Sequence, residues 1–576
     1  MHREPKIQAD DSGRPDTIVA RFIARASSDP VRIAFFIYPM GALQSLSRMS
    51  WGDWIAGSRS ACGALLSLHA AKAERVAIFA DNHALWPIAA LGVMMCGLVP
   101  VAIHPQAKPD QLVAQLSECG AKIVIVDTVA RFKLLRSVLS LLPGHVTIIC
   151  DDLEPLRTNA AEGVYEWESW CKAGAKALDE YEPMRAVLAE RIDGVMPSDR
   201  AFMTFGGGEQ AMVLTHENLL ASAALIVSTF GLTYVDRVSS YKPLSDPFEI
   251  QLAICGAILS GYTTALLEHS SDAFIAARQF EASIFSGASR AFDRLKDAFE
   301  NARTNGSYLR DTACEMLGRH CRLALLDGDV LPEHLHRDLR SGGVALATVY
   351  GTAQQNCICV NGPQKFEDNS IGVPFPGIEA HVSEHGELQV RRSALSFAGN
   401  RADGESVNAP TDDAAWLHTG DRVEQTASGA FRLIGHTRDL LQFADGRSVA
   451  PQSIEDELAR LPFVQYAVCH ADGNNSIVAV LSLKRSAVEA WALTKGIAMP
   501  WEALVALSLV HDELARGVAE INARHNFTER VVAFAPTDLE FTVENGELNE
   551  RGQIVRSVVV SRFRHVFADL HNNRHA

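Results

Sequence analysis

The chain has 576 residues, of which 47% are hydrophobic and 21% charged, and its formal net charge is -16. This length exceeds what one hydrophobic core usually supports, so we expect at least two domains of ordinary globular composition. The acidic balance, without any run of Lys or Arg, argues against a nucleic-acid partner, because such a surface needs clustered positive charge.

The eleven cysteines are scattered, with no Cys-x-x-Cys pair and no spacing typical of a zinc site. We therefore expect reduced thiols in a cytoplasmic protein. Residues 1–16 are polar and mixed in charge, unlike a signal peptide. Residues 84–103 form an apolar run long enough to cross a membrane, but Pro and Gly interrupt it and it ends in Val-Pro-Val-Ala-Ile. We interpret it as a buried helix followed by a buried parallel strand, not as a transmembrane span.

Between residues 51 and 267, helical periodicity alternates with short β-branched runs, for example at residues 75–80, 121–127 and 145–150. Strand and helix in alternation predict parallel sheets with covering helices. Residues 386–391 instead have the alternation and turn signals of antiparallel structure, and residues 400–414 are typical of a surface loop. A helix is predicted after Pro451, and paired strands are predicted over residues 464–483.

Eight short motifs occur in a fixed order along the chain. They are Pro243-Leu-Ser, Phe285-Ser-Gly-Ala-Ser-Arg, Tyr350-Gly-Thr, Gly372-Val-Pro-Phe-Pro-Gly-Ile-Glu, Gly386-Glu-Leu-Gln-Val, Trp416-Leu-His-Thr-Gly-Asp, Gly435-His-Thr-Arg-Asp-Leu-Leu and Gly446-Arg-Ser-Val-Ala-Pro-Gln-Ser-Ile-Glu. In this order the chain resembles the adenylate-forming (acyl-activating) enzymes, and among them the long-chain acyl-CoA synthetases and AMP-dependent synthetases. Each motif alone is weak, whereas the ordered set is specific.

The resemblance implies an α/β fold with a large N-terminal domain of parallel α/β sheets, residues 1–437, which includes a small β-barrel at about 372–437. A small α+β C-terminal lid domain, residues 438–576, would follow after a hinge at Arg438 and Asp439. The family's chemistry has two steps: a carboxylate attacks ATP to give an acyl-adenylate and pyrophosphate, and a thiol then displaces AMP. That thiol would belong to CoA or to the phosphopantetheine of an acyl-carrier protein.

Several motif positions match residues that the family uses for the nucleotide and for catalysis. The phosphate loop matches Thr204, Gly206, Gly207 and Gly208, whose backbone amides could form an anion-binding nest. The adenine-packing aromatic matches Tyr350, followed by Gly351 and Thr352, and the ribose-binding carboxylate matches Asp421. His216 matches a Thr-His pair near the acyl carboxylate and is a candidate base, with a merely packed histidine as the equal alternative. Arg438 lies at the hinge.

The positions that should meet the phosphates have the wrong chemistry. Gln210 stands where the family has Lys, Gln354 where a Glu holds magnesium, His436 where it has Arg, and Gln553 where a catalytic Lys bridges carboxylate and α-phosphate. A neutral amide is a poor ligand for Mg²⁺, so ATP or AMP binding is expected but a magnesium site is not. Arg551 and Arg556 lie near Gln553 in the sequence and offer other positive charge.

The same pattern leaves three functions open. The chain could be an acyl-CoA synthetase-like ligase for an apolar fatty or aryl acid or its thioester, with ATP chemistry weakened by the lost charges. It could be a pseudoenzyme that binds acyl-CoA, acyl-carrier protein or nucleoside without turnover. It could also be a repurposed ATP-independent acyl transferase or hydrolase with His216 as base.

Overall fold

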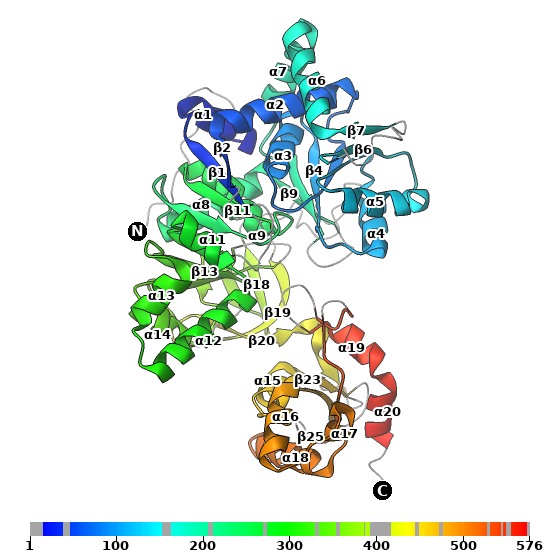
Figure 1. The fold of residues 1–576 in the computed structure, drawn as a ribbon, viewed down its shortest axis with the longest axis vertical. Coiled ribbons are helices and arrows are strands. Elements are labelled where there is room, and N and C mark those ends of the chain that lie inside the picture. The colour runs from blue at the N-terminus through cyan, green and yellow to red at the C-terminus, as the bar shows by residue number, and fades with distance from the viewer. Residues whose placement is uncertain are drawn as a thin grey trace. The chain divides into compact units, whose positions relative to one another are not determined.

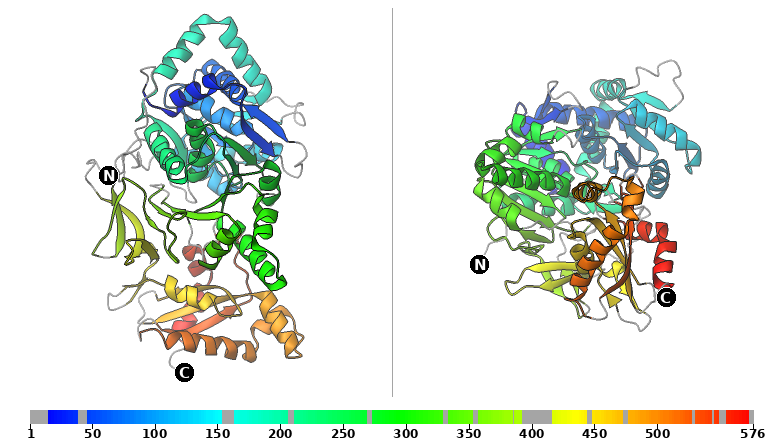
Figure 2. Two further views of the ribbon diagram at one scale, coloured as in Figure 1. Left: turned by 90° about the vertical axis from the view of Figure 1, so that its left-hand side faces the viewer. Right: turned by 60° about the horizontal axis from the view of Figure 1, so that its bottom comes forward.

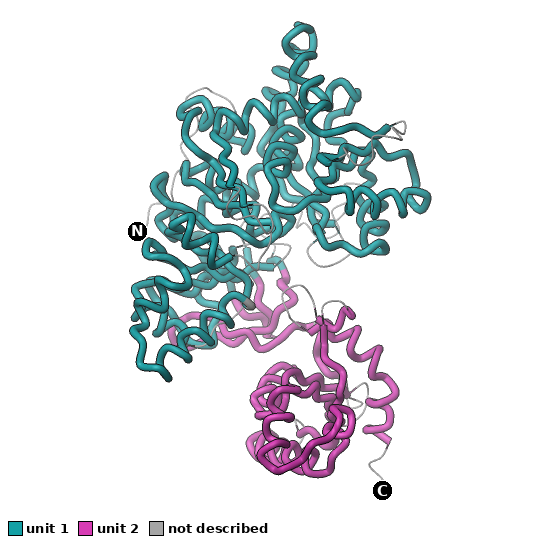
Figure 3. Tube along the Cα trace, in the orientation of Figure 1, with its two compact units in different colours: residues 1–380, 390–417 teal, residues 381–389, 418–576 magenta. Residues whose placement is uncertain are grey.

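The computed structural model describes residues 15–38, 46–152, 163–205, 211–268, 273–328, 333–352, 357–384, 386–391, 416–443, 448–471, 476–526, 530–542, 545–548 and 554–572. The chain divides into two units, which Figure 3 distinguishes by colour. Unit 1 comprises residues 1–380 and 390–417, and unit 2 comprises residues 381–389 and 418–576. The predicted domain boundary and hinge at residues 437–439 stay predictions.

The first sheet of unit 1 has seven strands in the order β7-β6-β5-β3-β4-β8-β9 (Figure 1). Its strands are β3 (Arg75–Phe79), β4 (Val99–Ile103), β5 (Ile123–Val126), β6 (Thr147–Cys150), β7 (Val164–Glu166), β8 (Arg200–Thr204) and β9 (Met212–Thr215). All neighbours pair in parallel except β8 and β9, which form an antiparallel pair. The central strands are buried along their length, as expected for a parallel sheet with both faces covered. The predicted strands over residues 75–80, 121–127 and 145–150 are confirmed.

The second sheet of unit 1 has nine strands in the order β16-β15-β14-β13-β12-β10-β11-β1-β2. They are β1 (Ile33–Tyr38), β2 (Ser47–Ser50), β10 (Arg237–Ser240), β11 (Thr263–Leu267), β12 (Ile284–Gly287), β13 (Leu323–Asp327), β14 (Ala345–Tyr350), β15 (Cys359–Asn361) and β16 (Val373–Pro374). The run from β14 to β1 is parallel, so β10, β12, β13 and β14 all end at the same edge. This edge carries the candidate site described below.

The helices of unit 1 pack against the two sheets or against one another. They are α1 (Ile18–Ser28), α2 (Trp51–Ser67), α3 (Leu85–Met95), α4 (Pro109–Cys119), α5 (Val129–Val138), α6 (Trp167–Glu180), α7 (Glu182–Asp193), α8 (His216–Phe230), α9 (Pro247–Glu249), α10 (Ala257–Ser260), α11 (Ala273–Phe280), α12 (Ser289–Asn305), α13 (Leu309–Leu317) and α14 (Glu333–Ser341). One buried core packs α4 and α5 on the seven-stranded sheet, and another packs α11 to α14 on the nine-stranded sheet. Helices α6 and α7 form a hairpin that projects from unit 1 (Figure 2).

The apolar run at residues 84–103 is helix α3 followed by strand β4, as predicted. No helix in the described part of the chain combines the length and the hydrophobicity needed to span a bilayer. The expectation of reduced cysteines is wrong for one pair, since Cys62 and Cys96 form a disulfide between α2 and the end of α3. Sequence spacing gave no sign of this pair, because packing of the two helices brings the residues together.

Unit 2 contains a curled four-stranded sheet where the small barrel was predicted: β17 (Glu379–Val382), β18 (Glu387–Arg391), β19 (Leu417–Gln425) and β20 (Phe431–His436). Residues at the start of β17, at the end of β18 and at the start of β19 are assigned to unit 1. A three-stranded sheet follows, of β23 (Val464–His470), β24 (Ile477–Leu483) and β25 (Val531–Thr537). The remaining elements are η6 (Thr437–Asp439), β21 (Leu441–Gln442), β22 (Ser448–Val449), α15 (Gln452–Ala459), α16 (Arg485–Thr494), α17 (Trp501–Val505), α18 (Ser508–Asn522), α19 (Arg556–Arg562) and α20 (Arg564–Asn572). The predicted strand pair over residues 464–483 is confirmed.

A fully buried π-helix, η3 (Ile250–Gly256), continues from α9 beneath helix α8. A wide helical turn leaves carbonyl groups without their usual α-helical partners. Here Tyr262 Oη donates to the carbonyl of Leu252, and Thr264 Oγ1 donates to that of Ala253 at 3.2 Å. Gly256 allows this arrangement, because a Cβ at that position would lie 2.1 Å from Tyr262 Oη.

We therefore expect Gly256→Ala to destabilise the protein by about 1–3 kcal/mol, as overpacking of a close-packed core does. Thermal unfolding measures the loss as a lower midpoint. Gly144→Ala is the matched control, since no atom lies within 4 Å of a Cβ placed there. Equal midpoints for the two variants would contradict this role for Gly256.

Candidate functional site

The predicted site residues are distributed over both units. Thr204, His216, Tyr350, Gly351 and Thr352 belong to unit 1, whereas Asp421, His436 and Arg438 belong to unit 2. Gly206, Gly207, Gly208 and Gln553 lie outside the described residues, as do Gln210 and Gln354. The roles of all these residues stay predictions, and the structure gives the surroundings of those it describes.

Thr204 and His216 lie at the two ends of the β8–β9 pair. Thr204 is the last residue of β8, and its hydroxyl donates to the carbonyl of Ser245 at 2.7 Å. The end of β8 is thereby joined to the loop after β10. His216 begins helix α8, whose N-terminus is capped by Thr215 through a reciprocal pair of hydrogen bonds with Asn218. A capped helix start fixes the backbone of the histidine.

His216 is only 2% exposed, and its Nδ1 has no hydrogen-bond partner in the part of the chain that the structure describes. Burial lowers the pKa of His216 to about 4, and nearby Asp199 opposes the shift. The ring is therefore neutral at physiological pH, with a nitrogen lone pair available to accept a proton. A neutral buried ring fits both readings of the sequence, a base and a packed side chain.

Tyr350 ends strand β14 and is 7% exposed, so its ring packs within the protein. Gly351 and Thr352 continue from it at the carboxyl edge of the nine-stranded sheet. In open α/β sheets, ligands bind outside this edge of the strands. The position of the Tyr350 segment is therefore suitable for a ligand.

Asp421 and His436 lie opposite each other on β19 and β20. His436 Nδ1 contacts Asp421 Oδ1 at ion-pair distance, although the carboxylate is nearly buried and the imidazole is partly exposed. The adjoining turn is held by Glu387, whose Oε1 accepts from the Gly420 backbone N–H at 2.9 Å. The carboxylate predicted to bind ribose is thus oriented by the residue that replaces the family's arginine.

Arg556 does not replace the lysine missing at position 553. Its guanidinium binds both carboxylate oxygens of Glu455, at 2.6 and 2.7 Å, and also the carbonyl of Cys469 at 2.8 Å. A largely buried ion pair with several hydrogen bonds holds the side chain in one position. It joins helix α19 to α15 and β23.

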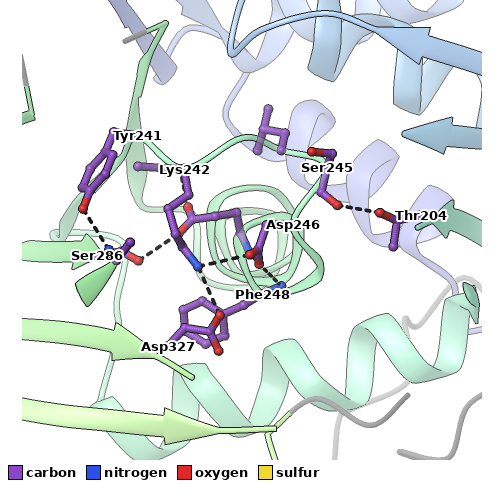
Figure 4. Close-up of polar contacts among 12 residues, drawn as sticks. Thr204, Tyr241, Lys242, Ser245, Asp246, Phe248, Ser286 and Asp327 are labelled. Carbon is purple, nitrogen blue, oxygen red and sulfur yellow. Dashed lines mark hydrogen bonds and ion pairs between the residues drawn. The ribbon is translucent and has the colours of Figure 1, made fainter. Parts of the chain in front are cut away.

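The structure reveals a charged group at the carboxyl edge of the nine-stranded sheet that the sequence analysis did not identify. We call Lys242, Asp246, Glu249 and Asp327 the Lys242 cluster (Figure 4). Lys242 Nζ lies 3.2 Å from Asp327 Oδ2, 3.4 Å from Asp246 Oδ2 and 3.7 Å from Glu249 Oε1. The sequence did offer one sign of this cluster: Lys242 is the second residue after the buried strand β10.

Hydrogen bonds fix each part of this cluster. Glu249 is fully buried and accepts from Ser240 at 2.5 Å and from Ser286 at 2.9 Å. Burial raises the pKa of Glu249, whereas the neighbouring Lys242 lowers it. Asp246 caps helix α9 by accepting from the backbone N–H groups of Phe248 and Glu249.

The described residues contain no group of three or more His, Cys, Asp and Glu side chains arranged to hold a metal ion. The Mg²⁺ used in phosphate chemistry is usually held by one or two carboxylates together with the phosphates themselves. The predicted magnesium position, Gln354, offers no carboxylate. The lack of a magnesium site at this position stays a prediction.

Comparison with known proteins agrees with this fold and these motifs. The family model described as "AMP-binding enzyme" matches residues 22–394, so the chain belongs to the AMP-binding enzyme family. It is 22% identical over 553 residues to the long-chain-fatty-acid–CoA ligase FadD15 of Mycobacterium bovis, covering 88% of this chain and 89% of the ligase. It is 22% identical over 520 residues to the peroxisomal long chain acyl-CoA synthetase 7 of Arabidopsis thaliana, covering 79% and 71%.

Solved structures show the same fold. The anthranilate CoA ligase AuaEII in complex with anthranoyl-AMP aligns with a TM-score of 0.73 at 19% identity, over 98% of this chain and 100% of that chain. A benzoate CoA ligase from Burkholderia xenovorans aligns with a TM-score of 0.70 at 18% identity, over 94% and 99%. The predicted α/β class and the acyl-CoA synthetase-like family are confirmed.

The low pKa of His216 predicts a pH dependence of stability. Between about pH 6.5 and pH 4 the unfolded chain binds a proton at this residue that the folded chain does not. The stabilisation is therefore fully present above pH 6.5 and is lost as the pH falls toward 4. We expect His216→Gln to reduce the decrease in unfolding free energy between pH 7 and pH 5 by about 2 kcal/mol.

Chemical denaturation at the two pH values measures this difference. His565→Gln removes an exposed imidazole and is the matched control. If the stability of His216→Gln falls with pH as steeply as that of the wild type, His216 is not a buried neutral base.

Proposed function

We propose that this chain is an acyl-CoA synthetase-like protein that binds a nucleoside and an apolar fatty or aryl carboxylic acid or its thioester, and that it carries out ATP-driven ligation only weakly. Membership of the AMP-binding enzyme family and relatives named as CoA ligases support the class of ligand. The reduced ATP chemistry is inferred from this chain's own residues.

The observation that carries the proposal is the contact between His436 and Asp421. The family has an arginine at position 436, near the ribose and the α-phosphate. Here an imidazole turns toward the ribose-binding carboxylate, and a partly exposed histidine is a weaker and pH-dependent source of positive charge. The chain keeps Asp421, the carboxylate predicted to bind the ribose, but at position 436 it lacks a permanently charged cation for the phosphate.

The other substitutions point the same way. Gln210, Gln354 and Gln553 are neutral where the family uses charge, and Glu209 adds a negative charge beside the predicted phosphate loop. Arg556, the described cation nearest in sequence to Gln553, is bound to Glu455. Each lost preorganised charge costs a phosphoryl-type transition state on the order of 3 kcal/mol, and the losses need not be additive.

ATP-independent acyl transfer or hydrolysis is a second candidate, with His216 as its base. The Nδ1 atom of His216 has no hydrogen-bond partner among the described residues and can accept a proton from a thiol or from water. Burial, which lowers the pKa of His216 to about 4, makes it a weak base. Turnover of an acyl thioester without ATP would separate this activity from nucleotide-dependent ligation. Binding of the same thioester without turnover would indicate a pseudoenzyme.

The acceptor of the acyl group is proposed to be CoA or the phosphopantetheine of an acyl-carrier protein. A cytoplasmic location is part of the same proposal. The acidic chain favours small-molecule partners over nucleic acid.

The first test compares nucleotides by calorimetry. We expect AMP to bind at least as tightly as ATP, with or without Mg²⁺, because Tyr350 and Asp421 are kept while the phosphate-facing charges are lost. Asp421→Ala should weaken AMP binding by about tenfold, equivalent to about 1.4 kcal/mol. If ATP with Mg²⁺ binds ten times more tightly than AMP or better, the proposed loss of phosphate recognition is wrong.

The second test restores the missing groups. The combined change Gln210→Lys, Gln354→Glu, His436→Arg and Gln553→Lys should raise acid-dependent pyrophosphate release by about tenfold or more, and each single change by much less. Groups that act around one phosphate and one metal ion are strongly non-additive. The opposite result has two parts: the wild type already forms acyl-adenylate at ordinary rates, and the combined change slows it. That result would show that these residues are a working variant site.

A further inference from the structure

The Lys242 cluster lies where a substrate of the proposed reaction would meet it. Lys242 follows strand β10 and Asp327 ends strand β13, at the same sheet edge as Tyr350 on β14. Asp327 pairs with Val349, the residue before Tyr350. The loop that carries Lys242 is also bonded to Thr204, which introduces the predicted phosphate loop. An acid that reacts beside the nucleotide would therefore pass this cluster.

The cluster is held in place before any ligand arrives. Asn82 donates to the carbonyl of Lys242 at 2.8 Å and accepts from the backbone N–H of Leu244 at 3.0 Å. Figure 4 shows Lys242 directed between Asp246 and Asp327, with Ser286 and Thr204 on the surrounding segments. With its loop clamped, Lys242 cannot leave the edge without breaking several bonds at once. The charges of the Lys242 cluster are therefore fixed in position at this edge of the sheet.

Three members of the cluster keep a small contact with solvent. The exposed side-chain fractions are 10% for Lys242, 18% for Asp246 and 10% for Asp327. A methylene chain laid against them would remove this last water without replacing its hydrogen bonds, which is unfavourable for charged groups. A hydroxyl group could instead accept from the ammonium and donate to a carboxylate. Being neutral, it would also leave the charge balance of the cluster unchanged.

From this geometry we propose that the Lys242 cluster determines substrate specificity, and that the acid of the proposed reaction carries a hydroxyl group which binds between Lys242 and the carboxylates of Asp246 and Asp327. This inference rests on the proposed function and narrows it from fatty or aryl acids to hydroxylated ones. Sites built to hydrogen-bond a hydroxyl discriminate strongly against the analogue that lacks it, because their buried polar groups are then left unpaired.

The test measures acid binding to the full-length protein by calorimetry in saturating AMP, which avoids any dependence on ATP chemistry. The probes are matched pairs: decanoate with 3-hydroxydecanoate and 10-hydroxydecanoate, and benzoate with 2- and 4-hydroxybenzoate. A further probe, 4-aminobenzoate, carries an amino group in place of the hydroxyl group. We expect at least one hydroxylated acid to bind ten times more tightly than its parent, or better.

Variants connect this preference to the cluster. Lys242→Met combined with Asp327→Leu removes one charge of each sign and should abolish or reverse the preference. The matched control is Lys172→Met with Glu168→Leu, an exposed ion pair on α6, which should keep it. Asp327→Asn alone is a milder change that should reduce the preference, and it decides the matter if the double variant does not fold.

The outcomes separate the two levels of the proposal. This inference is overturned if parent and hydroxylated acids bind equally to the wild type, or if both cluster variants keep the preference for the hydroxylated acid. Either result would leave the proposed function standing. Tighter binding of 4-aminobenzoate than of 4-hydroxybenzoate would overturn the choice of a hydroxyl group. If no acid binds in the presence of AMP, the proposed function fails and this inference fails with it.

Discussion

Lys242, surrounded by Asp246, Glu249 and Asp327, connects the segment after β10 with the end of β13, which lies far from it in the sequence. The loop after β10, the start of the π-helix and the end of β13 all meet at this ammonium group. Removing one partner from a buried ion group of this kind typically costs about 3–5 kcal/mol, because the remaining charges stay buried without compensation. The loop after β10 in turn accepts a hydrogen bond from Thr204, so the end of β8 is joined to the same charged loop.

Two features of the charge distribution underlie the proposals made above. Neutral or weakly basic residues stand where the resemblance predicts cations at the phosphates, and the described arginine near the C-terminal motif is bound within unit 2. At the carboxyl edge of the nine-stranded sheet, a lysine and three carboxylates lie together. Under the proposed function, both features suit a protein that keeps the scaffold of acid activation but has different ligand preferences.

Local sequence patterns predicted the fold well because they report burial. The alternation of β3, α3 and β4 followed from apolar runs and β-branched segments, and the motif order identified the family. The contacts within the site could not be predicted in this way. The pairing of Asp421 with His436 depends on strand register and on an irregularity between Arg422 and Val423. The contact of Lys242 with Asp327 joins residues 85 positions apart, and the Cys62–Cys96 disulfide depends on how two helices pack.

The central claim is that the nucleoside half of the site is kept while the phosphate half is lost. It is tested most directly by supplying a synthetic acyl-adenylate of the best-bound acid, together with CoA, and comparing thioester formation with that from the free acid, ATP, Mg²⁺ and CoA. The account predicts that the acyl-adenylate yields thioester at least about a hundred times faster, since it bypasses the step that needs the missing charges. Equal rates from the two starting points, or a faster reaction from free acid and ATP, would contradict it.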